Sequence, residues 1–195
     1  MKIFNILSIL LVLLFISCFV SGQDGRASRA DIREHREYEK QMRKEQRERE
    51  LEQKSGITKK MVEIQRFVLE ADNLSDKYGN RIMVSPNINF IMIDSLDGVL
   101  QFGSAFTVGY NGVGGQTLDG RITKYEYSMM GRNKDSYNIR MIFMSPIGTY
   151  DITMTVNPEG YADATIRGNW SGQLNYHGKL VPLGLSKVYK GHSLF

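Results

Sequence analysis

Apolar and polar residues alternate along most of the chain from residue 89 onward, which is the pattern of strands that bury one face. In the clearest stretch the apolar positions are Ile152, Met154 and Val156, and threonines occupy the positions between them. The same alternation covers residues 139–143 and 161–167. Strands with one apolar and one polar face are typical of antiparallel sheets, because parallel sheets are usually buried on both faces. We therefore expect a mainly β fold, an antiparallel meander or partly open barrel of about seven strands.

Turn residues separate these strands. Asn157–Gly160 combines a Pro that fixes φ with a Gly that permits positive φ. Residues 89–93 and 99–102 form a hairpin in outline, with Asp94–Gly98 between them. Asp94 and Asp97 resemble a carboxylate pair, but their place beside Gly98 is typical of a turn.

A charged arm precedes the strands. Residues 29–54 are almost all Arg, Lys, Glu and Gln, without Gly or Pro, which favours a solvated helix. Its apolar residues have no heptad spacing, so a coiled coil is disfavoured. We expect Ser55–Gly56 to end this helix, which gives a helical arm over residues 23–56 and a β-rich domain over residues 57–195. Residues 64–71 fit both a helix and a strand, so the pattern leaves that boundary open.

The N-terminus reads as an export signal over residues 1–22. Lys2 is followed by an apolar stretch, and small residues precede a cleavage site between Gly22 and Gln23. Two alternatives remain: an uncleaved membrane anchor, and a lipoprotein modified at Cys18. We therefore expect an exported protein, periplasmic or secreted, that contacts the membrane only if the signal is retained or Cys18 carries lipid.

Charge and length narrow the function. The chain has 195 residues, 42% of them hydrophobic, and a net charge of +4, which suits one ordinary core or two small domains. The arm holds 10 basic and 9 acidic residues, and residues 57–195 hold 14 and 12, so neither part has the basic excess of a phosphate-binding surface. Nucleic acid is therefore not an expected partner. One Cys excludes an intrachain disulfide.

The search for chemistry finds no catalytic set. The histidines His35, His177 and His192 lack ligand spacing, so we expect no metal and no cofactor. The glycine-rich stretch 109–116 lacks a following helix and the Lys of a phosphate-binding loop, so it reads as a connection between strands, with gating of a pocket as its functional alternative. A Gly-x-Ser-x-Gly elbow is absent, although serine triads also assemble from distant positions.

Aromatic residues fall in or beside several strand segments. Packing in the sheet is their ordinary role. The functional alternative is a stacking surface for a sugar or an apolar ligand. The candidate surface residues are Tyr125, Tyr127, Trp170, Tyr176 and His177.

Five stretches of the body resemble a family of exported Bacteroidetes proteins classed as a domain of unknown function. They are Phe67–Ala71, Asn89–Ile93, Val99–Gly103, Asn157–Ala162 and Asn175–Leu180. The family usually has Leu-Pro-Tyr-Phe-Gly where this chain has Val-Leu-Gln-Phe-Gly. The resemblance implies a signal peptide followed by one β-rich domain, and it transfers no catalytic residue.

These observations favour an exported, non-enzymatic binding or envelope-interaction protein. Its partner would be a protein, glycan or lipid of the cell envelope. The alternatives are a periplasmic hydrolase and a carrier that encloses a small apolar ligand in its barrel. A filled interior favours the interaction protein, a cavity favours the carrier, and a cleft where His177 meets carboxylates favours the hydrolase.

Overall fold

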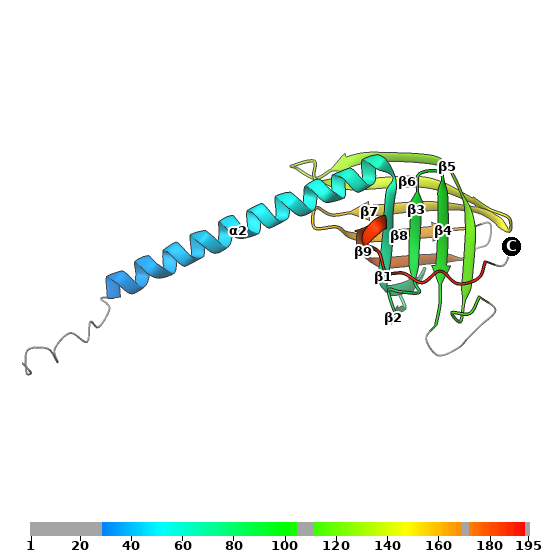
Figure 1. Ribbon diagram of the computed structural model, residues 1–195, viewed down its shortest axis with the longest axis horizontal. Coiled ribbons are helices and arrows are strands. Elements are labelled where there is room, and N and C mark those ends of the chain that lie inside the picture. Colours follow the sequence, from blue (N-terminus) through cyan, green and yellow to red (C-terminus); the bar gives the residue numbers. More distant parts are fainter. Residues whose placement is uncertain (1–28, 105–110, 169–171, 194–195) are drawn as a thin grey trace, which may run out of the picture. The chain divides into compact units, whose positions relative to one another are not determined.

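The computed structural model describes residues 29–104, 111–168 and 172–193. In chain order its elements are α2 (Arg29–Ile64), β1 (Arg66–Asp76), β2 (Arg81–Met83), β3 (Phe90–Asp94), β4 (Asp97–Phe102), β5 (Gln116–Met130), β6 (Ser136–Ser145), β7 (Gly148–Val156), β8 (Tyr161–Arg167), β9 (Gln173–Pro182) and the 3-10 turn η1 (Leu183–Leu185) (Figure 1). Contacts divide the chain into two units, residues 1–47 and 48–195. The second unit holds all the strands.

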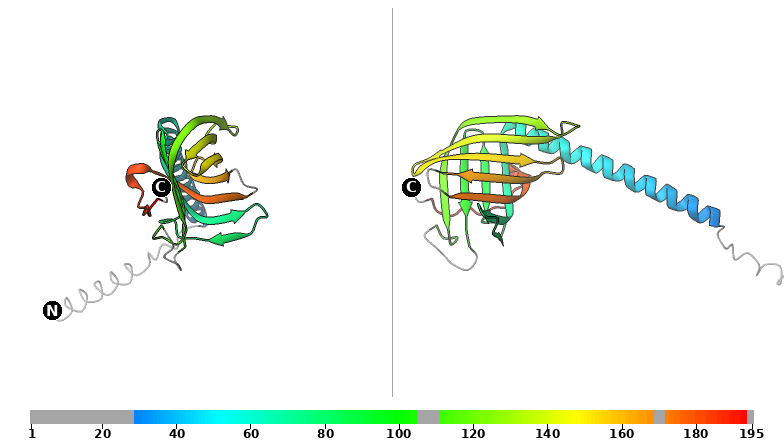
Figure 2. Two further views of the ribbon diagram at one scale, coloured as in Figure 1. Left: turned by 90° about the vertical axis from the view of Figure 1, so that its right-hand side faces the viewer. Right: turned by 180° about the vertical axis from the view of Figure 1, so that it is seen from behind.

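The strands form an antiparallel meander that closes into a barrel. From β3 to β9 each strand pairs with the next, and β1 pairs with β3 on one edge and with β9 on the other. Eight strands therefore make the barrel, and β2 adds to β1 beside it. Figure 2 shows β3 and β4 on one side and β6–β9 on the opposite side, and the long strand β5 bends from the first side to the second. The predicted mainly β meander or barrel is confirmed, with β1 as the strand that closes it.

Closure brings β1 and β9 together at a glycine. A Cβ atom at Gly178 would lie 1.9 Å from the carbonyl oxygen of Glu70, so a side chain there would hold the two strands apart. In the sheet register Gly178 pairs with Ala71 of β1 and with Ala162 of β8. Small residues on all three strands permit this close approach.

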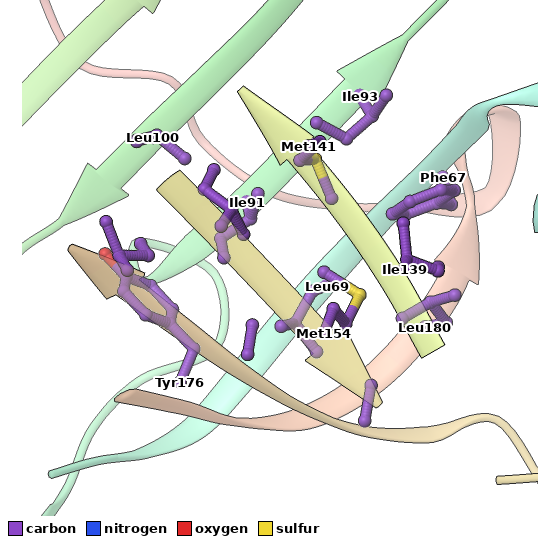
Figure 3. Packing of buried hydrophobic residues seen from close by; sticks show 14 of the residues in the cluster. Phe67, Leu69, Ile91, Ile93, Leu100, Ile139, Met141, Met154, Tyr176 and Leu180 are labelled. Carbon is purple, nitrogen blue, oxygen red and sulfur yellow. The ribbon is translucent and has the colours of Figure 1, made fainter. Parts of the chain in front are cut away.

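The barrel interior is filled with side chains (Figure 3). Its largest fully buried members are Tyr176, Phe67, Phe143, Leu69, Ile91, Ile93, Ile139, Ile152 and Met154. The predicted alternation in β7 is confirmed, because Ile152, Met154 and Val156 are buried and the threonines between them are exposed. Each fully buried aliphatic or aromatic side chain contributes about 1.5–3 kcal/mol to folding.

Helix α2 continues past the predicted break. The expectation that Ser55–Gly56 would end it is wrong, because the helix runs on to Ile64. Tertiary burial outweighs the low helix propensity of glycine here: Thr58, Met61 and Val62 in the following turns are buried. Gln65, with a φ of 56°, follows the last helical residue, and β1 begins at Arg66. The boundary that the sequence left open therefore lies at Gln65.

The described part of the arm is exposed. Every residue from 31 to 54 meets solvent, and Arg43 pairs with Glu39 one helical turn away at 3.3 Å. The predicted solvated helix over residues 29–54 is confirmed. Within the described ranges, no helix has the length and apolar character that crossing a bilayer requires. The predicted signal peptide, with Cys18, Gly22 and Gln23, lies outside the described residues.

A C-terminal strap, residues 183–193, covers the outer side of β1, β3 and β4 (Figure 1). Beneath it Val68, Phe90 and Val99 form a second small apolar cluster, against which Leu183 and Val188 pack. Gln101 fastens the strap: its amide nitrogen donates to the carbonyls of Tyr189 and Ile88, and its amide oxygen accepts from the Gly191 N–H at 2.8 Å. We call the outer side of β1, β3 and β4 beneath the strap, with Val68, Phe90, Val99 and Gln101, the covered face.

Candidate functional site

A bulge in β1 sets which way its second half faces. Up to Ala71 the odd-numbered residues point into the barrel, but the register shifts between Ala71 and Asn73. After the shift Leu74 points inward, so Ser75 points out of the barrel. Bulges of this kind re-aim side chains by inserting one unpaired residue. Without the bulge, Ser75 would lie in the apolar core.

Ser75 meets a histidine and an aspartate from the next two strands. Its hydroxyl lies 2.9 Å from Nε2 of His177, and Nδ1 of the same ring lies 2.6 Å from Oδ1 of Asp163. In the sheet register His177 stands directly opposite Asp163 on β8, whereas Ser75 stands opposite Asn175 and therefore reaches the His177 ring diagonally from β1. The hydroxyl is thus within hydrogen-bond reach of a base, which is in turn oriented by a carboxylate.

The three groups differ in exposure. Ser75 exposes only 7% of its surface, and the side chain of His177 exposes 21%. The Asp163 side chain exposes 73%. Water therefore screens the carboxylate strongly, whereas the serine and the ring nitrogen beside it are sheltered.

Further amide and hydroxyl groups lie along the same strands. The Asn175 amide nitrogen donates to Ser75 Oγ at 3.2 Å and to the Asp76 carbonyl at 3.1 Å. The Asn175 amide oxygen accepts from Thr165 at 3.0 Å and from Gln173 at 2.8 Å. These bonds fix the side-chain orientations before any ligand arrives.

The edge strand β2 adds a cation. Nη2 of Arg81 lies 3.5 Å from Nε2 of His177. The turn that positions Arg81 is held by Asp76, whose carboxylate accepts from Asn80 and from the Tyr78 N–H. The Asn80 side-chain hydrogen bond is the main cause of the lowered pKa of Asp76. We call this outer wall the open face, and its residues are Ser75, Arg81, Asp163, Thr165, Arg167, Gln173, Asn175 and His177.

The structure separates the aromatic candidates that the sequence put forward. Tyr176 lies inside the barrel, where its hydroxyl donates to the Gln101 carbonyl, so it forms no part of an outer surface. Tyr125 is half-buried and donates to the Val62 carbonyl, and Tyr127 beside it is exposed. Of the four candidates that the structure describes, His177 alone lies on the open face. Trp170 lies outside the described residues.

Ser75, Asp163 and Arg81 were absent from the sequence candidates. The outward direction of Asp163 could have been predicted, since the alternation of residues 161–167 places it on the polar face with Thr165 and Arg167. That of Ser75 could not, because it depends on a bulge that follows from strand pairing. The contact with His177 depends on the β8–β9 and β9–β1 registers together.

The arrangement offers a sheltered hydroxyl, a base beside it, and a row of oriented hydrogen-bonding groups. Such a set suits nucleophilic chemistry at Ser75 or the binding of a polar partner along the strands. In residues 29–104, 111–168 and 172–193 no three His, Cys, Asp or Glu side chains come together as metal ligands would.

Comparison with known proteins gives a family and a solved structure. The family model described as "Domain of unknown function (DUF4251)" matches residues 49–180. A crystal structure of a DUF4251 family protein from Bacteroides eggerthii is similar, with 28% sequence identity and a TM-score of 0.57. The similarity covers 68% of this chain and 90% of that chain. No curated protein matches the chain.

Proposed function

This chain belongs to the DUF4251 family, and we propose that it is an exported binding protein whose open face holds a glycan of the cell envelope. Export is supported by the apolar segment near Lys2 and by the small residues before Gln23. A similar crystal structure from a Bacteroides species agrees with the Bacteroidetes resemblance of the sequence.

The observation that carries the proposal is the hydrogen-bonded array of side chains on the open face. Thr165 and Gln173 both donate to the Asn175 amide oxygen, and Arg167 Nε donates to Gln173 Oε1 at 3.2 Å. Side chains that are already ordered lose little conformational entropy when a ligand binds, so this wall is prepared for contact. The filled interior supports an outer surface as the binding site, because the same barrel has its central space occupied by Tyr176, Phe67 and other core side chains.

A saccharide fits the chemistry of this wall better than an apolar ligand. Hydroxyl and amide groups are the partners that sugar hydroxyls require. Tyr161, at the start of β8 and on the same outer side as Asp163 and Thr165, adds an exposed aromatic ring whose centroid lies 5.9 Å from the Lys179 ammonium. Aromatic rings with polar neighbours bind amphipathic ligands such as sugars.

The test is co-sedimentation of the purified protein with three envelope fractions: insoluble polysaccharide, lipid vesicles and solubilised envelope protein. We expect binding to the polysaccharide and a loss of at least about tenfold in affinity for Asn175→Ala, since the amide orders Ser75, Thr165 and Gln173 before the ligand binds. Asn138→Ala on β6 is the matched control and should bind like the parent protein. Binding to vesicles or to envelope protein alone would contradict the glycan assignment.

The hydrolase is the second candidate. The contact of Ser75 with His177, and of His177 with Asp163, is the observation in its favour.

A further inference from the structure

We propose that Ser75 is a reactive nucleophile and that the open face carries out acyl transfer from small acyl esters, with His177 as the general base. This activity goes beyond the binding function and gives the hydrolase candidate named above a nucleophile and a substrate class, and it rests on the Ser75–His177–Asp163 geometry alone. It would stand whether or not the same wall binds a glycan.

The hydrogen-bond directions suit the reaction. Asn175 donates to Ser75 Oγ, so the hydroxyl hydrogen is left to point elsewhere, and Nε2 of His177 lies 2.9 Å away as its acceptor. For Nε2 to accept, the ring proton must sit on Nδ1, which then donates a hydrogen bond to Oδ1 of Asp163 at 2.6 Å. The carboxylate and the amide are thus positioning residues, and Ser75 and His177 are the catalytic pair.

The reaction balances with an ester and water as its reactants. Ser75 Oγ forms a bond to the carbonyl carbon while its proton passes to Nε2 of His177. The ester C–O bond then breaks, and the departing alkoxide takes that proton, which leaves an acyl group on Ser75. Water attacks the acyl carbon, gives its proton to Nε2, and the bond to Ser75 Oγ breaks as the hydroxyl is restored.

Arg81 supplies the positive charge that the carbonyl oxygen needs as it becomes negative. Its Nη2 donates to the same ring nitrogen at 3.5 Å. Once Nε2 has taken the proton of Ser75 it can no longer accept, so the guanidinium turns to the carbonyl oxygen of the substrate. A fixed cation near developing negative charge stabilises the transition state. Arg81 reaches this position because Asp76 holds the turn between β1 and β2.

Burial of Ser75 determines the substrate class. Only 7% of the residue is exposed, so the acyl group that reaches Oγ must be narrow, such as acetyl. The leaving alcohol faces the open side of the wall, where Asp163 is largely exposed, and it is therefore free to be large.

The first experiment is labelling of the purified full chain with a fluorophosphonate. The reagent loses fluoride as its phosphorus bonds to Ser75 Oγ, and the mass gain is located by peptide mapping. We expect one labelled site, Ser75, with no label in Ser75→Ala and full labelling in Ser128→Ala, which removes an exposed strand serine on β5. Absence of label, or a label that persists in Ser75→Ala, would overturn the proposal.

The second measurement separates catalysis from structure. His177→Gln should slow labelling and the hydrolysis of p-nitrophenyl acetate about 100-fold, the lower range for loss of a positioned general base. Asp163→Asn should slow both about fivefold because its carboxylate is screened, and Asp163→Glu should recover part of the rate. Each variant should keep the parent melting temperature within about 3 °C. Rates unchanged in His177→Gln would mean that these side chains serve the sheet only.

Glycan binding is measured separately by the co-sedimentation assay. Labelling of Ser75 without binding to polysaccharide would support the nucleophile and contradict the glycan-binding proposal. Binding to polysaccharide without labelling of Ser75 would contradict the nucleophile proposal and leave the glycan-binding proposal standing.

Discussion

The covered face and the open face are two outer walls of one barrel, and strand β1 contributes to both. Val68 in its first half lies under the C-terminal strap, and Ser75 in its second half lies beside His177 on the open face. Each wall has a hydrogen-bonded set of side chains, built around Gln101 on one and Asn175 on the other. The strap removes the first set from water, whereas the second set has no such cover among the described residues.

This difference separates polar groups that the strap seals from water from polar groups that water or a ligand can reach. Buried polar side chains must be satisfied within the protein, because an unpaired buried group costs about 1–3 kcal/mol. Gln101 meets this need with four partners, on the strap and on the barrel. The side chains around Asn175 lie nearer to solvent, where water can replace a lost hydrogen bond. Folding therefore depends less on their hydrogen bonds than on those of Gln101.

The largest expected effect on stability comes from placing a carboxyl group on the inner side of a strand instead of its outer side. Met154→Asp places a carboxyl in the filled interior, where the charged form has no partner, and we expect the domain to unfold or the carboxyl to stay neutral. Thr153→Asp, one residue away on the outer side, should change the free energy of unfolding by less than about 1 kcal/mol. Urea denaturation measures both. Equal damage from the two substitutions would mean that both sides of β7 are buried.

A smaller effect is expected from matched glutamines on the two walls. Gln101→Ala leaves two carbonyls and the Gly191 N–H under the strap without their partner, and should cost about 3 kcal/mol or more. Gln173→Ala on the open face should cost less than about 1 kcal/mol, because water reaches its partners. The same denaturation assay compares them. Costs within about 0.5 kcal/mol of each other would remove the distinction between the faces.

The smallest expected effect is a loss of stability at alkaline pH. Burial raises the pKa of the Tyr176 and Tyr125 hydroxyls above the ordinary value of 10.0. The unfolded chain therefore releases these protons first, so stability is constant below about pH 10 and falls as the pH rises beyond it. Melting temperatures from pH 8 to 11, with tyrosinate absorbance followed in parallel, test this. Full ionisation of the tyrosines before unfolding would contradict the burial of this pair.

The alternation of side chains predicted the strands, because a strand with one buried face records that burial at every second residue. Ile152, Met154 and Val156 show this directly. Closure of the barrel was not predictable in the same way, since the pairing of β1 with β9 joins residues about 100 positions apart. The continued helix past Gly56 also depends on tertiary contacts, namely burial of Met61 and Val62.

The candidate site was predictable only in part. His177 stood out from the sequence as a polar residue of a strand, and the polar positions of β8 pointed to Asp163 as an outward side chain. The sequence does not show that the Ser75 side chain points outward, because its direction depends on the bulge between Ala71 and Asn73. A site formed by one residue from each of three strands appears only when the strand registers are fixed.

The most direct test of the account is an NMR titration of side-chain amides with a soluble envelope polysaccharide. Four amides report on the two walls: Gln173 and Asn175 on the open face, and Gln101 and Asn111 beneath the strap or beside it. We predict that the first two resonances shift in proportion to the bound fraction while the other two remain in place. Shifts confined to Gln101 and Asn111, or to the methyl groups of interior residues such as Met154, would contradict binding at the open face.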